Sequence, residues 1–291
     1  MKKIKESKTI GGRELTLETG LLAKQASGSV LIGYGETVAL VTVTSSKGDE
    51  EDRGFFPMSV EYREKFYASG RIPGGFFKRE ARPSEREILS ARLTDRPLRP
   101  LFPKGFNNET GVVINVLSYD GENEPDILGT IGASAAILVS DIPWNGPVAS
   151  VRMGKIDGKL TVNPTVEQSS ESTLDIIVSG TQDSIVMVEG GSDFISEEEL
   201  VECIQEAHKS IKDIIDLQIK LASHLNVSKR DVKEKEPNKE LEDSIDSLIG
   251  EDYKKLNDAK DKHSRYEDIR LYREEIISKM AEDWPDDGGS I

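Results

Sequence analysis

Short extended segments with few helices between them constrain this chain more than any other feature of its sequence. Residues 13–18 alternate polar and apolar side chains, as a half-buried strand does. Residues 29–32 and 37–43 are rich in β-branched residues, and the glycine-containing turn between them predicts a β-hairpin. Further extended stretches fall within residues 55–67 and 112–117. The first half of the chain therefore predicts a sheet.

Two helices are predicted among these strands. Ser84 and Glu87 have the spacing of a capping box, so a helix is expected to begin near Ser84. Pro97 is expected to end this helix, because proline lacks the N–H that an interior helical position donates. Residues 125–139 predict a second helix with many glycines and alanines, which implies that a neighbouring element packs close against it.

The pattern changes in the second half of the chain. Four more strand segments are expected to complete the sheet, at residues 148–153, 160–162, 174–178 and 185–188. Ser196 and Glu199 form a second capping-box pattern, which opens an amphipathic helix to about Asn226. Residues 227–239 form a polar connector, and the apolar residues after it recur at helical spacing. The fold class is therefore α/β (α+β in the stricter sense), with a domain at 1–228 and an all-helical domain at 240–284.

Composition excludes several classes of protein. The chain has no apolar run near the roughly 20 residues of a membrane span, so no membrane association is expected. The single cysteine, Cys203, cannot form an internal disulfide, which fits the cytoplasm. Glu202 and Glu206 are expected to raise its thiol pKa, which disfavours a nucleophile. The three histidines have no metal-ligand spacing, and no phosphate-binding glycine motif is present.

Charge is distributed unevenly along the chain. The formal net charge of −15 argues against a nucleic-acid partner, because binding to phosphates is mostly electrostatic. Residues 63–104, however, hold eleven Lys or Arg and five Asp or Glu, a local net charge of +6. Such a basic island is a candidate surface for a polyanion, although a solvated basic face would show the same composition.

The basic island contains two adjacent aromatic residues in a glycine-rich loop. Phe76 and Phe77 stand directly before Lys78 and Arg79. Aromatic rings stack on unpaired bases, and cations neutralise phosphates, so this combination predicts contact with single-stranded RNA. The alternative is that both rings pin the loop onto the core.

Arginines continue the basic island beyond this loop. The five are Arg82, Arg86, Arg92, Arg96 and Arg99. Arg92 and Arg96 are four residues apart and are expected to share a helix face, while Arg99 is expected on an extended segment after Pro97. Their guanidinium groups suit phosphate oxygens. The alternative is pairing within the chain, with Glu85, Glu87 and Asp95.

These segments resemble the first core domain of bacterial polynucleotide phosphorylase. The two longest matching motifs are residues 71–80 (RIPGGFFKRE) and 93–103 (LTDRPLRPLFP). Shorter ones are residues 17–20 (LETG), 131–135 (IGASA), 145–147 (NGP) and 178–181 (VSGT). The motifs occur in one order from about residue 10 to 189, and the helical region is similar to the linker domain of that family.

The resemblance implies an RNase PH-like fold and a homotrimer. It implies RNA degradation from the 3′ end, with phosphate as co-substrate and nucleoside diphosphates as products. Other RNA-degradation proteins are implied as further partners. A Phe-Phe-Arg-Arg loop holds the strand in the family, and its counterparts here are Phe76, Phe77, Lys78 and Arg79. Lys78 departs from the pattern, because it keeps the charge but lacks the planar fork of arginine.

The resemblance also implies that catalysis and magnesium belong to a second core domain beyond this chain. The chain is thus expected to be a fragment or a truncated form, with no catalytic residue of its own. Asp175 stands alone where the catalytic half has two metal-binding carboxylates, so no metal site is expected here. The resemblance places residues 122–126 (ENEPD), three of which are acidic, where the catalytic half of the family has a serine-rich phosphate loop. The alternatives are residual phosphorolysis, supported by Asp175, and a scaffold whose arginines hold the trimer together.

Overall fold

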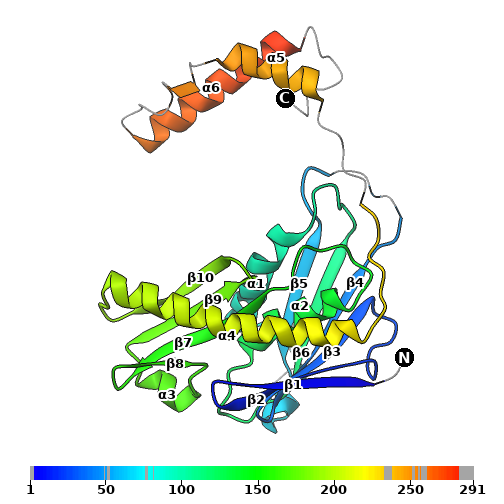
Figure 1. Cartoon of the computed structure of the whole chain (residues 1–291), viewed down its shortest axis with the longest axis vertical. Coiled ribbons are helices and arrows are strands. Elements are labelled where there is room, and N and C mark those ends of the chain that lie inside the picture. The colour runs from blue at the N-terminus through cyan, green and yellow to red at the C-terminus, as the bar shows by residue number, and fades with distance from the viewer. Residues whose placement is uncertain are drawn as a thin grey trace. The chain divides into compact units, whose positions relative to one another are not determined.

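The chain divides into two compact units, Met1–Lys233 and Glu234–Ile291. The computed structural model describes residues 3–48, 50, 53–75, 78–80, 82–232, 238–250, 253–254, 256 and 261–281. The domain boundaries expected for the family, 1–228 and 240–284, stay a prediction. Figure 1 traces the first unit, in which two sheets and their helices form a mixed α/β fold, as the sequence predicted.

A six-stranded sheet occupies the first part of this unit, in the order β1-β2-β3-β4-β6-β5. Its strands are β1 (Ile4–Ile10), β2 (Arg13–Thr19), β3 (Gly28–Tyr34), β4 (Thr37–Ser45), β5 (Met58–Glu64) and β6 (Thr110–Ser118). Strand β5 lies at the edge and pairs in parallel with β6, whereas the other neighbours are antiparallel. The sequence did not predict β1, which is polar and is held by its pairing with β2 and by a helix across it.

The later strands form a second sheet, which corrects the expectation of a single one. Its order is β10-β9-β7-β8, with β7 (Ala149–Ile156), β8 (Lys159–Val162), β9 (Leu174–Gly180) and β10 (Ile185–Ser192). Strand β9 pairs with β7 on one side and β10 on the other, and β7 also pairs with β8, so within the described residues these four strands pair only with one another. Side-chain alternation marks a strand but carries no information about its pairing partner.

Helices join the two sheets around one core. They are α1 (Glu85–Leu98), α2 (Asp126–Leu138), the short α3 (Val166–Ser170) and α4 (Glu197–Ser223). The capping boxes predicted at the starts of α1 and α4 are both present. Helix α2 packs against β3, β4 and β7, and α4 packs against β1, β7 and β9, so each helix contacts both sheets. Figure 1 shows α4 running across them.

Helix α2 makes the close contacts that its small residues implied. A Cβ atom at Gly132 would lie 2.5 Å from Val41 Cγ2 and 3.1 Å from Ile32 Cγ2. One at Gly129 would lie 3.0 Å from Thr94 Oγ1 of α1. These positions bring the backbone of α2 against the six-stranded sheet and against α1, and so fix where α1 lies.

Pro97 does not end α1, contrary to the prediction. The helix continues through Pro97 to Leu98 and passes into the 3₁₀ turn η2 (Arg99–Leu101). Proline removes only its own hydrogen bond, and the backbone N–H of Arg99 bonds to the carbonyl of Asp95. Pro97 and Leu98 are also buried. Arg99 therefore lies on a helical turn rather than on an extended segment.

The first residues of the polar connector belong to the first unit. Lys229 Nζ donates to the carbonyls of Ile137, Leu138 and Ser140, near the end of α2. Burial lowers the pKa of Lys229 to about 8, against the opposing charge of Asp141. Arg230 donates to the carbonyl of Ser46. A lysine at helix carbonyls satisfies acceptors that the helix leaves open.

The second unit is helical in its described residues, as the spacing predicted. It contains α5 (Lys239–Ile249) and α6 (Lys262–Met280). Its buried core consists of Leu241, Ile276 and Met280, with Ile245, Ile249 and Tyr272 packed around them. In neither unit does a described helix combine the length and apolarity needed to cross a bilayer.

Candidate functional site

The glycine-rich loop before α1 presents unpaired cations. Lys78, Arg79 and Arg82 are all exposed. No side chain in the described part of the chain forms an ion pair or hydrogen bond with any of the three. Phe76 and Phe77 lie outside the described residues, so their stacking on bases stays a prediction. The loop thus offers positive charge that the rest of the described chain does not neutralise.

Glu80 fixes part of this loop to the 3₁₀ turn η1 (Phe66–Ser69). Its carboxylate accepts from Lys65 Nζ at 3.0 Å and from the backbone N–H of Phe66 at 3.3 Å. The hydrogen bond from Lys65 lowers the pKa of Glu80, against a smaller effect of burial. Lys78 and Arg79 therefore lie within two residues of Glu80, which is anchored beside η1.

The arginines of α1 and η2 divide into paired and unpaired groups. Arg86 contacts Glu64 and Glu124, and Arg96 contacts Glu189. Arg99 donates to Asp95 and to the carbonyls of Phe56 and Met58. Of the three acids expected to pair with these arginines, Asp95 alone does so among the described residues. Arg86 and Arg96 instead pair with acids outside α1. Binding of RNA by any of them stays a prediction.

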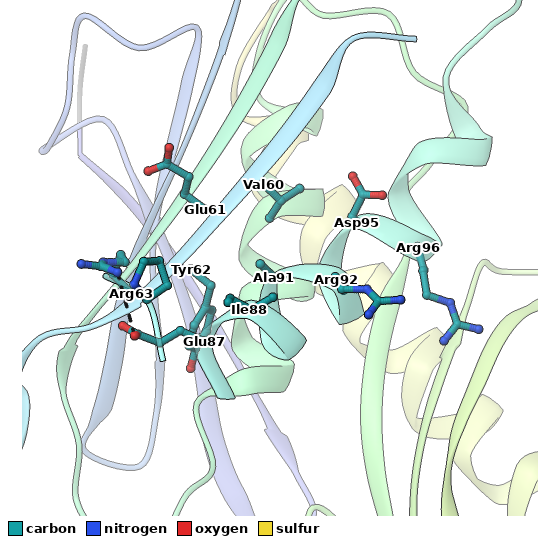
Figure 2. A pocket seen from close by; sticks show the side chains of 11 residues that line it. Val60, Glu61, Tyr62, Arg63, Glu87, Ile88, Ala91, Arg92, Asp95 and Arg96 are labelled. Atoms are coloured by element: carbon teal, nitrogen blue, oxygen red, sulfur yellow. Dashed lines mark ion pairs between the residues drawn. The ribbon is translucent and has the colours of Figure 1, made fainter. Parts of the chain in front are cut away.

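Arg92 differs from these three. It is exposed, and the described residues offer it neither an ion pair nor a hydrogen bond. Arg92 and Arg96 line one cavity of about 770 Å³ between β5 and α1, together with Pro83 at the end of the loop. Figure 2 shows their guanidinium groups extending from the same side of α1, away from Arg63, so the predicted shared face is present. Arg92 is thus the member of α1 best placed to accept an external anion.

A compact network of acids around Arg152 lies next to this face, and part of it lines a second cavity of about 570 Å³ together with Arg92 and Arg96. Arg152 of β7 donates to Asp126 Oδ2 at 2.6 Å and to both oxygens of Asp175, at 2.9 and 2.8 Å. Burial acts to lower the pKa of Arg152, but the charges of Asp126 and Asp175 outweigh it and raise the pKa. Burial also raises the pKa of Glu124, against the charge of Arg86. The guanidinium of Arg152 therefore occupies the space between the carboxylates.

This network does not fit a divalent cation. Asp175, the carboxylate that the sequence singled out, has both oxygens bonded to Arg152. Within the described ranges, no group of three acidic, histidine or cysteine side chains is arranged to hold a metal ion. A magnesium ion requires oxygens that are free to coordinate it. No magnesium chemistry is assigned to these residues.

The isolated nucleophile and base candidates have structural surroundings. Cys203 is buried, and burial raises the pKa of its thiol to about 11. The cause is therefore burial rather than the nearby glutamates that the sequence suggested. His208 lies 2.9 Å from the carbonyl of Thr181, and His224 lies 2.8 Å from Glu6. Among the described residues, no hydrogen bond joins either histidine to Cys203.

Sequence reasoning missed two features of the site. Phe66 and Tyr67 of η1 are 42% and 58% exposed, and Arg71 follows them. An aromatic residue in an extended stretch is usually expected in the hydrophobic core, and nothing in the sequence indicates that these two side chains face solvent. Arg152 was also missed, because its carboxylate partners come from α2 and β9, which only the fold brings together.

Comparisons with known proteins agree with this architecture. Two models of the 3′ exoribonuclease family match the chain, domain 1 over residues 11–143 and domain 2 over residues 146–210. The polyribonucleotide nucleotidyltransferase of Thermomicrobium roseum is 50% identical over 276 residues, or 95% of this chain and 35% of that protein. The enzyme of the same name from Heliobacterium modesticaldum is 46% identical over 98% of this chain and 40% of its own length.

The chain thus spans about two fifths of the length of these curated relatives. Among solved structures, rice Rrp46 has a similar fold, with a TM-score of 0.57 at 16% identity. That match covers 71% of this chain and 93% of the rice protein. At this identity the likeness concerns the fold alone.

Proposed function

This chain belongs to the 3′ exoribonuclease family, and from that membership we propose that it grips single-stranded RNA for a polynucleotide phosphorylase. That activity shortens RNA from its 3′ end, with phosphate as co-substrate, and releases nucleoside diphosphates. The proposal gives this chain the task of holding the strand. It leaves bond breaking and magnesium to a second core domain of the kind that the resemblance implies.

One observation supports this assignment above the others. Lys78, Arg79, Arg82 and Arg92 are exposed and have no partner among the described residues, although the chain as a whole is strongly acidic. Acidic residues neutralise most other arginines nearby, so these four cations are available to phosphates. Each phosphate that a cation neutralises on a single strand releases bound counterions, which favours binding at low salt.

The cluster around Arg152 supports a binding rather than a catalytic role. Asp126 and Asp175 are both bonded to Arg152, and Glu124 is bonded to Arg86, so these carboxylates are not free to coordinate a metal ion. We further propose that the protein acts as a homotrimer in the cytoplasm, together with other RNA-degradation proteins, on the strength of the family alone.

The salt dependence of RNA binding tests the grip. With one phosphate contact each, these four cations alone contribute about −2.8 to the slope of log affinity against log salt, at about 0.7 per phosphate. Lys78→Ala with Arg79→Ala should make that slope shallower by about 1.4 and weaken binding of a fluorescent single-stranded RNA, measured by anisotropy. Lys24→Ala with Lys159→Ala removes two exposed lysines from outside residues 63–104 and serves as the charge-matched control.

Two results would contradict the proposal. If the loop variant kept the original slope while Arg96→Ala dissociated an oligomer, the arginines would serve assembly, as in the scaffold alternative. If the chain alone released nucleoside diphosphates from RNA in the presence of phosphate, the assignment of catalysis to another domain would be wrong.

A further inference from the structure

The 3₁₀ turn η1 exposes two adjacent aromatic rings. Phe66 is 42% exposed and Tyr67 is 58% exposed. Arg71 follows at the end of the turn, is exposed, and has no ion-pair partner in the described parts of the chain. Rings of this size normally contribute to a core, and a pair left in solvent beside an unpaired cation indicates a binding surface.

A cavity of about 280 Å³ opens beside this turn. Its lining includes Phe66, Arg71, Arg86 and Tyr119. The guanidinium of Arg86 is already held by Glu64 and Glu124, and Lys65 is held by Glu80, which leaves Arg71 as the open cation among the described residues that line the cavity. The cavity therefore combines the rings of Phe66 and Tyr119 with one available positive charge, while Tyr67 lies outside its lining.

Backbone contacts hold η1 in place. The N–H of Arg71 bonds to the carbonyl of Phe66, and the N–H of Tyr119 bonds to the carbonyl of Ala68, both at 3.0 Å. Gly70 takes the left-handed conformation that ends the turn, at φ 70°. The surface is thus ordered before any ligand arrives, which reduces the entropy lost on binding.

The same turn adjoins the loop to which we assign the grip on RNA. Glu80 bonds to Lys65 and to the backbone N–H of Phe66. Glu80 follows Lys78 by two residues and Arg79 by one, so both cations lie close in sequence to a residue that contacts η1. A single RNA strand can therefore contact Lys78 and Arg79 and then η1, which are adjacent on the protein.

We propose that η1 is a second contact for single-stranded RNA, in which an unpaired base stacks on Phe66 or Tyr67 and Arg71 binds a neighbouring phosphate. This inference rests on the proposed function and names a further site for the same substrate. Stacking on an aromatic ring tolerates any base, so the site would add affinity without sequence preference. It would also lengthen the path of the strand beyond the loop.

Replacing the rings by leucine tests the stacking. Phe66→Leu with Tyr67→Leu keeps apolar side chains but removes both aromatic faces, and should weaken RNA binding about tenfold, or about 1.4 kcal/mol. The fluorescence of a 2-aminopurine base in the RNA should be quenched by the original chain and less by the variant. Phe55→Leu replaces a phenylalanine that is 65% exposed and serves as the matched control.

The charge at Arg71 gives an independent readout. Arg71→Gln should make the salt slope shallower by about 0.7, whereas the leucine variant should keep the slope and lose affinity at every salt concentration. An RNA with abasic sites across its length should bind the original chain and the leucine variant equally. Circular dichroism confirms folding, and the single variant Tyr67→Leu is available if the double variant does not fold.

The outcomes separate this inference from the one on which it rests. If the original chain does not bind RNA, both are wrong. If Lys78→Ala with Arg79→Ala weakens binding but the leucine variants bind as the original does, only the η1 site is wrong. A change in oligomeric state with unchanged RNA affinity would assign the rings to a protein interface and would also overturn it.

Discussion

Arg92 and Arg99 should behave in opposite ways when each is replaced by alanine, although both belong to the same basic island. Arg99 donates four hydrogen bonds, two to Asp95 and one each to the carbonyls of Phe56 and Met58. Arg92 has no partner in the described part of the chain. Arg99 therefore holds η2 against the residues around the start of β5, whereas Arg92 is free to bind a ligand.

The contacts set the expected magnitudes. Arg99 is 39% exposed, so solvent screens its pair with Asp95, and we take about 0.5 kcal/mol for it. The two bonds to carbonyls add about 1 kcal/mol each. A total of about 2–3 kcal/mol should lower Tm by roughly 4–12 °C in a unit of this size. Arg92→Ala should change stability by less than about 0.5 kcal/mol.

RNA binding should show the reverse order. Arg92→Ala should make the salt slope shallower by about 0.7, and Arg99→Ala should leave it unchanged at temperatures where the variant is folded. Differential scanning fluorimetry and an anisotropy titration at several salt concentrations measure the two quantities on the same samples. If Arg99→Ala makes the salt slope as shallow as Arg92→Ala does and leaves Tm unchanged, then contacts within the chain do not separate structural arginines from RNA-binding ones, and the reasoning is wrong.

Two further predictions concern the fold that carries the site. Gly132→Ala should lower stability by about 1–3 kcal/mol in a urea titration, because the new Cβ would meet the stiff side chain of Val41 at 2.5 Å. Gly191→Ala has open space and should be close to neutral, and equal effects would contradict the packing argument. Burial acts to raise the pKa of Asp120, but bonds from Asn123, Glu122 and Thr37 outweigh it and lower the pKa to about 2. Its stabilisation, below about 2 kcal/mol after screening, should be complete above pH 4 and lost as pH falls toward 2, so the Tm gap to Asp120→Asn should close over that range.

Local signals in the sequence predicted most of the individual elements. Capping boxes placed the starts of α1 and α4, because the side chains that make them are three residues apart and need no tertiary partner. The turn at 33–36 placed the hairpin of β3 and β4 for the same reason. The small residues of α2 indicated close packing, which the contacts of Gly129 and Gly132 confirm.

Contacts between residues far apart in the sequence could not be predicted from these local signals. Arg86 and Arg96 lie close in sequence to three acids, yet they pair with Glu64, Glu124 and Glu189 from other elements. The division of the strands into two sheets and the exposure of Phe66 and Tyr67 depend likewise on long-range contacts.

The order of residues by itself determined where α1, α4 and the hairpin of β3 and β4 begin, which family the chain resembles, and that positive charge is concentrated in residues 63–104. Only the tertiary structure decided which of those positive charges remain open to a ligand. The physical reason is that a cation is neutralised by whichever carboxylate the fold brings within a few ångströms, whatever their separation along the chain. Glu189 reaches Arg96 from the edge strand of the second sheet, while Arg92, one helical turn earlier, meets no such carboxylate among the described residues.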